Sequence, residues 1–171
     1  MGPLRCAVLL LWMGLSSPFV PAQSDCQALL ELRTAYLGHS TLAQAMESKA
    51  LAESLLPDAS GKCAVQIQAH RWVSLARSAD FGFNPAGKLS RLNEGIDALD
   101  DLIEQHPDLD ILKALRLSVT GTAPRFLAVD ENWKEDLAAM QRLLAVDYWA
   151  ESPKFSAWMS DLAEQIESER S

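Results

Sequence analysis

The sequence has few residues that interrupt regular structure and few positive charges. Its 171 residues include 8 glycines and 8 prolines, which is too few for a fibrous or low-complexity protein. Lys and Arg number 15 against 23 Asp and Glu, so the formal net charge is -8. Because phosphate groups attract basic surfaces, this charge argues against non-specific binding to nucleic acid or to anionic membranes.

Catalytic signatures are also missing. The chain has no Gly-x-Ser-x-Gly elbow, no phosphate-binding loop and no dinucleotide-binding fingerprint. None of its 3 histidines belongs to a His-Glu-x-x-His run that would hold zinc. We therefore expect no catalytic residue, no cofactor and no metal site, and we do not expect an enzyme.

The remaining composition is that of an ordinary globular protein, with 49% apolar and 22% charged residues. No segment shows the sustained alternation of apolar and polar residues that is typical of strands. Apolar residues instead recur at spacings of three and four through most of the chain. These patterns predict an all-α fold of about seven helices in a single domain over residues 23–171.

Residues 1–22 have the pattern of a secretory signal. Arg5 precedes the apolar run Cys6–Leu15, and Val20 and Ala22 are small enough for the positions that flank a cleavage site. The apolar run has about half of the ~20 residues that a spanning helix needs. We expect a cleaved signal and an exported protein, periplasmic or secreted, with an uncleaved anchor as the alternative.

Two cysteines, Cys26 and Cys63, remain after residue 22. An even number of cysteines in an exported chain favours a disulfide, because export usually leads to an oxidising compartment. The two cysteines lie at the starts of the first and third predicted helices, which run parallel in an antiparallel stack. We predict that they form a disulfide, and two free thiols are the alternative.

Several residues mark where the predicted helices begin and end. Thr41 starts the second helix, Pro57 ends it, and Pro153 opens the last one. Residues 79–88 are predicted to form a loop because they contain two glycines and a proline, and residues 167–171 are expected to fray. The predicted helices cover about residues 24–38, 41–56, 63–78, 89–106, 109–120, 132–144 and 153–166.

Short connections between helices leave two arrangements open. One is a closed bundle, and the other is a stack of helical hairpins similar to tetratricopeptide repeats. Gly95 and Pro107 favour the stack, because small residues face the partner helix and a proline ends the unit in those repeats. The repeat period and the first-helix pattern do not match, so the expected fold is tetratricopeptide-like and not a true repeat array.

Residues 84–144 carry a series of short motifs. The motif residues are Asn84-Pro85, Lys88-Leu89, Gly95, Pro107, Leu112–Arg116, Pro124–Leu127 and Asp136. This pattern resembles a family of small bacterial helical proteins of unknown function, and it departs from that family at Ile111 and Lys113. The resemblance covers about a third of the chain. It implies a bacterial, helical, exported protein, and it carries no activity or ligand.

Two charged residues stand among the apolar positions of consecutive helices. Arg116 follows Leu112 by four residues, and Asp136 follows Trp133 by three. Charged side chains are rarely buried without a partner. We therefore predict that Arg116 and Asp136 form a hydrogen-bonded ion pair. The alternative is that Arg116 extends to water while Asp136 only favours the start of its helix.

Four aromatic residues are candidate partner contacts. Trp72 and Trp149 fit the apolar faces of the helices poorly, so we expect them in a groove or an interface. Phe81 and Phe83 lie in the predicted loop, where they either contact a partner or fold back onto the helices.

The function expected from these patterns is that of an exported helical module that binds another protein, of unknown identity, through a concave surface. The runner-up is a small-molecule-binding accessory protein of the cell envelope, with a Trp-lined cavity between its helices. An enclosed pocket with a convergent polar group would favour the second hypothesis, and an open groove with exposed aromatic residues would favour the first.

Overall fold

The structure is a computed structural model that describes residues 26–129 and 131–170. Within those residues the chain forms seven α-helices and no strand, which confirms the all-α prediction. The predicted signal at residues 1–22 lies outside the described residues. None of the described helices is both long and apolar enough to cross a membrane.

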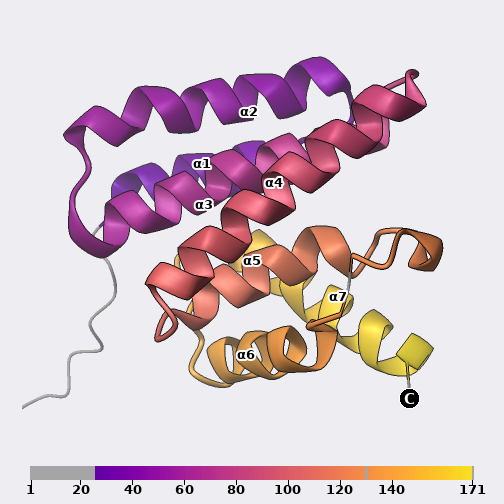
Figure 1. The fold of residues 1–171 in the computed structure, drawn as a ribbon. Coiled ribbons are helices and arrows are strands. Elements are labelled where there is room, and N and C mark those ends of the chain that lie inside the picture. Colours follow the sequence, from indigo (N-terminus) through magenta and orange to yellow (C-terminus); the bar gives the residue numbers. More distant parts are fainter. Residues whose placement is uncertain (1–25, 130, 171) are drawn as a thin grey trace, which may run out of the picture.

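The first three helices form the upper part of the molecule in Figure 1. They are α1 (Gln27–Leu37), α2 (Leu42–Leu55) and α3 (Gly61–Arg77); α2 packs along α3, and α1 contacts both. The Thr41 Oγ1 accepts a hydrogen bond from the Gln44 backbone N–H at 3.2 Å, so the predicted start of α2 is confirmed. A short 3-10 turn that contains Pro57, η1 (Leu56–Asp58), ends α2.

The segment predicted as a loop over residues 79–88 is mostly helical. The 3-10 turn η2 (Ser78–Phe81) follows α3 directly, and α4 (Pro85–Gln105) begins inside the predicted loop. The Asn84 side chain accepts a hydrogen bond from the Ala86 N–H at 3.1 Å. The prediction was wrong because Pro85 occupies the first helical position, where a missing N–H does no harm.

The helix α4 approaches α3 very closely. A Cβ atom added at Gly95 would lie 2.7 Å from the Trp72 carbonyl oxygen and 2.8 Å from the Ala76 Cβ. Any larger residue at position 95 would force the two helices apart. The sequence expectation that Gly95 faces a partner helix is therefore confirmed. Because α3 also contacts α1, α2 and α5, it is the central helix of the fold.

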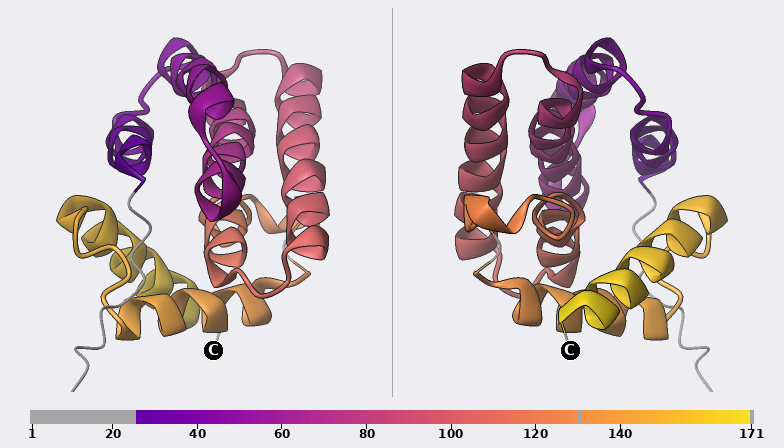
Figure 2. Two further views of the ribbon diagram at one scale, coloured as in Figure 1. Left: turned by 90° about the vertical axis from the view of Figure 1, so that its left-hand side faces the viewer. Right: turned by 90° about the vertical axis from the view of Figure 1, so that its right-hand side faces the viewer.

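The last three helices form the lower part of the molecule in Figure 1. They are α5 (Asp110–Thr120), α6 (Trp133–Ala145) and α7 (Pro153–Arg170), with a 3-10 turn, η3 (Arg125–Leu127), between α5 and α6. The tail predicted to fray continues α7 as far as Arg170. Figure 2 shows α1 and α7 on the same side of the molecule, with α4 on the opposite side, and α1 and α7 are in contact.

The core divides into two clusters. The larger cluster lies between α3 and the helices α4 to α7, and its fully buried residues include Leu99, Leu112, Leu115, Met140 and Met159. The smaller cluster joins α1, α2 and α3 through Leu29, Leu32, Ala52 and Ile67. The hydrophobic effect therefore fixes α1 and α2 mainly through their contact with α3.

Candidate binding site

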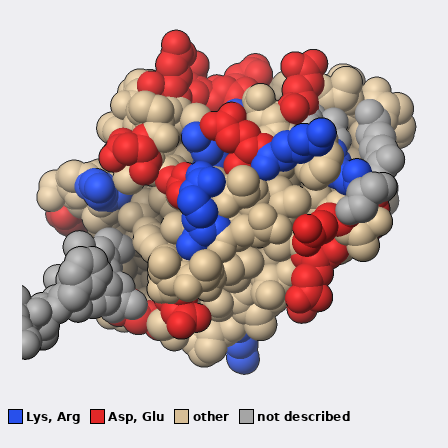
Figure 3. All heavy atoms as spheres, turned by 90° about the horizontal axis from the view of Figure 1, so that it is seen from below, with Lys and Arg blue, Asp and Glu red and all other residues tan. Residues whose placement is uncertain are grey.

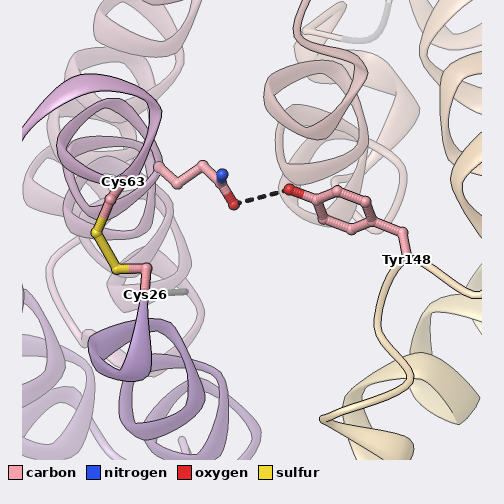
Figure 4. The surroundings of a disulfide bond; sticks show 4 residues. Cys26, Cys63 and Tyr148 are labelled. Atoms are coloured by element: carbon pink, nitrogen blue, oxygen red, sulfur yellow. Dashed lines mark hydrogen bonds between the residues drawn. A yellow bond between two sulfur atoms is a disulfide. The ribbon is translucent and has the colours of Figure 1, made fainter. Parts of the chain in front are cut away.

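The predicted disulfide forms at the edge of the smaller core cluster. Cys26 precedes α1 and Cys63 lies in the first turn of α3, with their Cα atoms 5.8 Å apart. Figure 4 shows the bond together with a hydrogen bond between distant segments of the chain. In that hydrogen bond, the Tyr148 hydroxyl donates to the Gln66 Oε1 at 3.0 Å. The disulfide confirms that α1 and α3 start at the same end of the molecule.

The structure also brings Arg116 and Asp136 together. The Arg116 Nε and Nη2 atoms donate to the two carboxylate oxygens of Asp136 at 2.8 and 2.7 Å. Asp100, which the sequence did not identify, accepts from the Arg116 Nη1. Arg116 is 6% exposed and Asp136 is 1% exposed, so Arg116 does not extend to water as the alternative proposed.

Burial and hydrogen bonding oppose each other in this pair, and burial raises the pKa of Asp136 although the bonds to Arg116 act against that shift. Burial by itself lowers the pKa of Arg116, but the hydrogen bonds to Asp136 and Asp100 outweigh it and raise that pKa above its usual value. The guanidinium therefore stays charged. This cluster links α4, α5 and α6, because each of the three guanidinium nitrogens of Arg116 donates to a carboxylate of Asp136 or Asp100.

Two further ion pairs join α5 to α6 at the surface. Lys113 donates to Glu135 at 2.6 Å, and Arg142 forms two hydrogen bonds of 2.7 Å with Asp110. These bonds to basic partners hold the pKa of Glu135 and of Asp110 below the usual values. Figure 3, a view from below, shows acidic and basic side chains intermingled on that face, so opposite charges lie close together there.

The expectation that Trp149 contacts a partner is wrong. Trp149 is 0% exposed and is the largest fully buried side chain among the described residues. It follows α6 in the turn that leads to α7, and its ring packs edge-on against those of Tyr148 and Phe155. The helical pattern could not place it because a turn residue belongs to no helical face.

The other three candidate contact residues differ in exposure. Trp72 is partly buried against the larger core cluster, and the Arg71 guanidinium stacks 4.1 Å from the centre of its ring. Phe81 is partly buried in η2. Phe83 is fully exposed in the short link between η2 and α4, so it does not fold back onto the helices. Of the four candidates, only Phe83 offers its whole side chain to a partner.

An apolar groove with a volume of about 440 Å³ lies next to this link. Its walls come from α3, η2, α4, the end of α5 and the segment 122–127. We define the apolar groove by Ala76, Ala79, Leu89, Leu92, Val119, Ala123, Phe126 and Leu127. Phe126 on its rim is 85% exposed, and Leu89 is 45% exposed. Large apolar side chains that lie exposed together around a groove are typical of a binding surface.

Three charged residues also line the groove. The Lys88 Nζ donates to the Asp80 carbonyl oxygen at 3.4 Å, and the Arg77 guanidinium lies 5.0 Å from the Tyr36 ring centre. The Arg77 Nε is buried and has no hydrogen-bond acceptor. Burial raises the pKa of Asp80, although Arg77 and Lys88 act against that shift. The groove therefore combines an apolar floor with the Lys88 ammonium, which donates one hydrogen bond of 3.4 Å and has further N–H groups.

The groove contains one residue that sequence reasoning overlooked. Phe126 belongs to the Pro124–Leu127 motif, but it was not identified as a contact residue. An aromatic residue between a proline and the next predicted helix, outside any apolar face, was the available signal.

Within residues 26–129 and 131–170, no group of three His, Cys, Asp or Glu side chains is placed so that it could hold a metal ion.

A second set of polar residues, also missed, lies between α1, α3 and the start of α7. Arg33, His39 and His70 are all more than nine-tenths buried, and each has a ring or guanidinium nitrogen without a hydrogen-bond partner. Arg33 follows Leu29 by four residues and precedes Tyr36 by three, which is the same type of spacing that identified Arg116. This spacing could therefore have identified Arg33 as a charged residue on a buried helix face.

No family model, curated protein or solved structure matches this chain.

Proposed function

We propose that this protein is an exported, non-enzymatic helical module that binds a segment of another protein in the apolar groove. The observation that carries the proposal is the exposed Phe126 on the rim of a groove with an apolar floor, together with the exposed Phe83 in the link between Asp80 and Pro85, two residues that line the groove. Burying a phenylalanine side chain contributes about 1.5–3 kcal/mol, so a partner that covers both rings would gain substantially.

The groove favours a peptide segment with an apolar side chain as its occupant. Leu92, Val119 and Leu127 offer an apolar floor but no fork of donors and acceptors for a highly polar ligand. A backbone carbonyl of the occupant would accept a hydrogen bond from the Lys88 ammonium, which lines the groove and donates only one bond within the described residues, to the Asp80 carbonyl oxygen at 3.4 Å. Every peptide carries such carbonyl groups, so one segment supplies both the apolar contact and the acceptor.

Export is part of the same proposal. The disulfide between Cys26 and Cys63 is compatible with an oxidising compartment, where such bonds persist. The signal-like pattern of residues 1–22 is the segment that would direct the chain to export. Fusing residues 1–22 to a reporter enzyme that is active only after export should give an active reporter, and the same fusion with Leu9, Leu10 and Leu11 changed to Asp should not.

Selection from a library of displayed random peptides tests the binding proposal directly. The selected peptides should share a large apolar residue and bind the purified protein. The variant Phe126→Ser should weaken this binding by about tenfold or more, because it removes most of a rim contact worth at least 1.4 kcal/mol. Val146→Ser is the matched control, since Val146 is 71% exposed and lies outside the groove.

Three results would contradict the proposal. They are the failure of any peptide to be enriched, binding that Phe126→Ser leaves unchanged, and a dimer of the protein that dissociates in the Phe126→Ser variant. The last result would show that the groove region binds a second copy of the chain.

Chemical-shift changes on peptide addition should map to Leu92, Val119 and their neighbours and not to α6.

A further inference from the structure

A second cavity, of about 530 Å³, lies between α1 and the start of α7. It is separate from the apolar groove and shares no lining residue with it. We call it the α1–α7 cavity and define it by Leu30, Arg33, Leu37, Glu151, Ser152, Lys154 and Phe155. Figure 2 shows α1 and α7 next to each other on one side of the molecule.

Arg33 gives the cavity a buried positive charge that no salt bridge within the described residues neutralises. The residue is 5% exposed, and its Nε has no hydrogen-bond acceptor among the described residues. Its guanidinium carbon lies 6.0 Å from the centre of the Phe155 ring, and the charge of Glu151, which lines the same cavity, also favours the charged form without a hydrogen bond. A buried charge without a hydrogen-bonded counter-charge is unfavourable, so a site of this kind attracts an anion.

The start of α7 points to the same conclusion independently. Ser152 precedes Pro153, the first residue of this 18-residue helix, and so occupies the capping position. Its Oγ is buried and bonds to nothing, so it does not cap the N–H groups of the first turn. Uncapped N–H groups and the helix dipole bind anions at helix N-termini.

The neighbouring charges restrict which anion fits. Lys154 lines the cavity and adds a positive charge, whereas Glu151 lines it and adds a negative one. His70, buried nearby, is neutral at physiological pH because burial, and then the charge of Arg33, lower its pKa to about 3. The remaining lining includes Leu30, Leu37 and Phe155. One net positive charge beside an apolar wall suits a monoanion with an apolar body better than a dianionic phosphate.

We propose that the α1–α7 cavity binds a small organic carboxylate with an apolar chain or ring. The carboxylate accepts hydrogen bonds from the Arg33 guanidinium and from the free N–H groups at the start of α7. The apolar body packs on Leu30, Leu37 and Phe155. A planar carboxylate matches the fork of an arginine, which makes this pairing specific as well as strong.

Calorimetry on the purified protein with decanoate as the probe tests the proposal. Decanoate should bind saturably at one site, and decanol and inorganic phosphate should each bind at least about tenfold more weakly, because each lacks half of the recognised chemistry. Equal binding of decanol would reveal an apolar cavity without a carboxylate site. Equal binding of phosphate would reveal an anion site without apolar recognition, and either result would overturn the proposal.

Variants of the cavity locate the bound carboxylate. Arg33→Met should weaken decanoate binding by about tenfold to a hundredfold, since a hydrogen bond to a charged group is lost. Arg91→Met is the matched control, because Arg91 also has a buried unpartnered Nε but does not line the cavity. Binding that survives Arg33→Met unchanged would overturn the proposal.

Two further variants keep the test informative if Arg33→Met fails to fold. Lys154→Ala, at an exposed position, should weaken binding, and Glu151→Gln should strengthen it by removing a repulsive charge. If both changes leave decanoate binding unaltered, the carboxylate does not lie in this cavity. Phe126→Ser should leave decanoate binding unchanged, which separates this proposal from the peptide-binding proposal.

Discussion

An arginine is buried at the interface between α5 and α6, and another is buried at the junction between α1 and α7. The two sites differ in whether the charge of the arginine is paired with a carboxylate. Arg116 at the first site bonds to Asp136 and Asp100. Arg33 at the second site forms no salt bridge with any described residue, and its neighbour His70 also has an unpartnered nitrogen. Buried polar groups that are satisfied specify the packing of a fold, whereas unsatisfied ones weaken it and are retained where they bind something.

The largest effect is expected at the paired arginine. Arg116→Met should lower the free energy of unfolding by about 3–5 kcal/mol, because it leaves the buried Asp136 carboxylate without its partner. Denaturant titration would measure the loss. In a double-mutant cycle, adding Asp136→Asn to Arg116→Met should cause less loss than the sum of the two single changes. Additive effects would mean that the two side chains do not interact.

The disulfide is expected to make the next largest contribution to the free energy of unfolding. It ties the start of α1, the helix that carries Arg33, to α3. Replacing Cys26 and Cys63 by Ser should lower the free energy of unfolding by about 3–4 kcal/mol, because the bond restricts a 37-residue loop of the unfolded chain. Thiol titration of the unreduced protein should find no free thiol at these two positions. A double variant as stable as the parent would show that the smaller core cluster holds α1 in place without the bond.

Acid should act on the buried histidines near α1 before it breaks the surface ion pairs between α5 and α6. The pKa of His70 is lowered to about 3 by burial and by Arg33, so between pH 6.5 and 3 the unfolded chain binds a proton that the folded chain does not. Stability is therefore complete above pH 6.5 and falls as the pH decreases, by about 2 kcal/mol at pH 5 from this residue.

Measurement of stability between pH 7 and 5 checks this prediction. His70→Gln should flatten the dependence, and His39→Gln should flatten it further because burial lowers the pKa of His39 to about 4. The carboxylates with lowered pKa values, such as Asp110, lose their pairing only at more acidic pH. A steep fall between pH 7 and 5 that survives both changes would place the acid sensitivity elsewhere.

The smallest effect is expected at the unpaired arginine. Arg33→Met should change the free energy of unfolding by less than about 1 kcal/mol, with stabilisation favoured, because an apolar side chain of similar length removes a buried charge without stranding a partner. Thermal unfolding of Arg33→Met and Arg116→Met side by side is the sharpest form of the comparison. A large loss in both variants would mean that Arg33 also stabilises the fold.

Much of the fold followed from the sequence because apolar spacing and helix caps act locally. The spacing of Arg116 and Asp136 within apolar faces, together with antiparallel neighbours, was enough to pair them. The same type of spacing placed Arg33 on a buried face, but no acidic residue at a matching position drew attention to it. The burial of Trp149 depends on how the turn after α6 folds over α3 and α7, which is a tertiary contact that no local pattern encodes.

The apolar groove illustrates the same limit. Its floor is assembled from α3, α4 and α5 and its rim from segment 122–127, so its residues are spread over about fifty positions of the sequence. Phe83 was identified because it lies in a short link, where side chains have no helical face to join. The interpretation of residues 79–88 as a loop was wrong in extent, but it directed attention to the one fully exposed phenylalanine among them.

The bond between Cys26 and Cys63 also changes what a protease can release from this protein. It closes a covalent ring that contains α1 and α2 together with the turns on either side of α2. A single cut in the turn at residues 38–41, or in the one at residues 59–60, would open the ring without freeing either piece. The nicked protein would migrate as one chain until a reductant was added, and its helices would remain docked on α3 in the meantime.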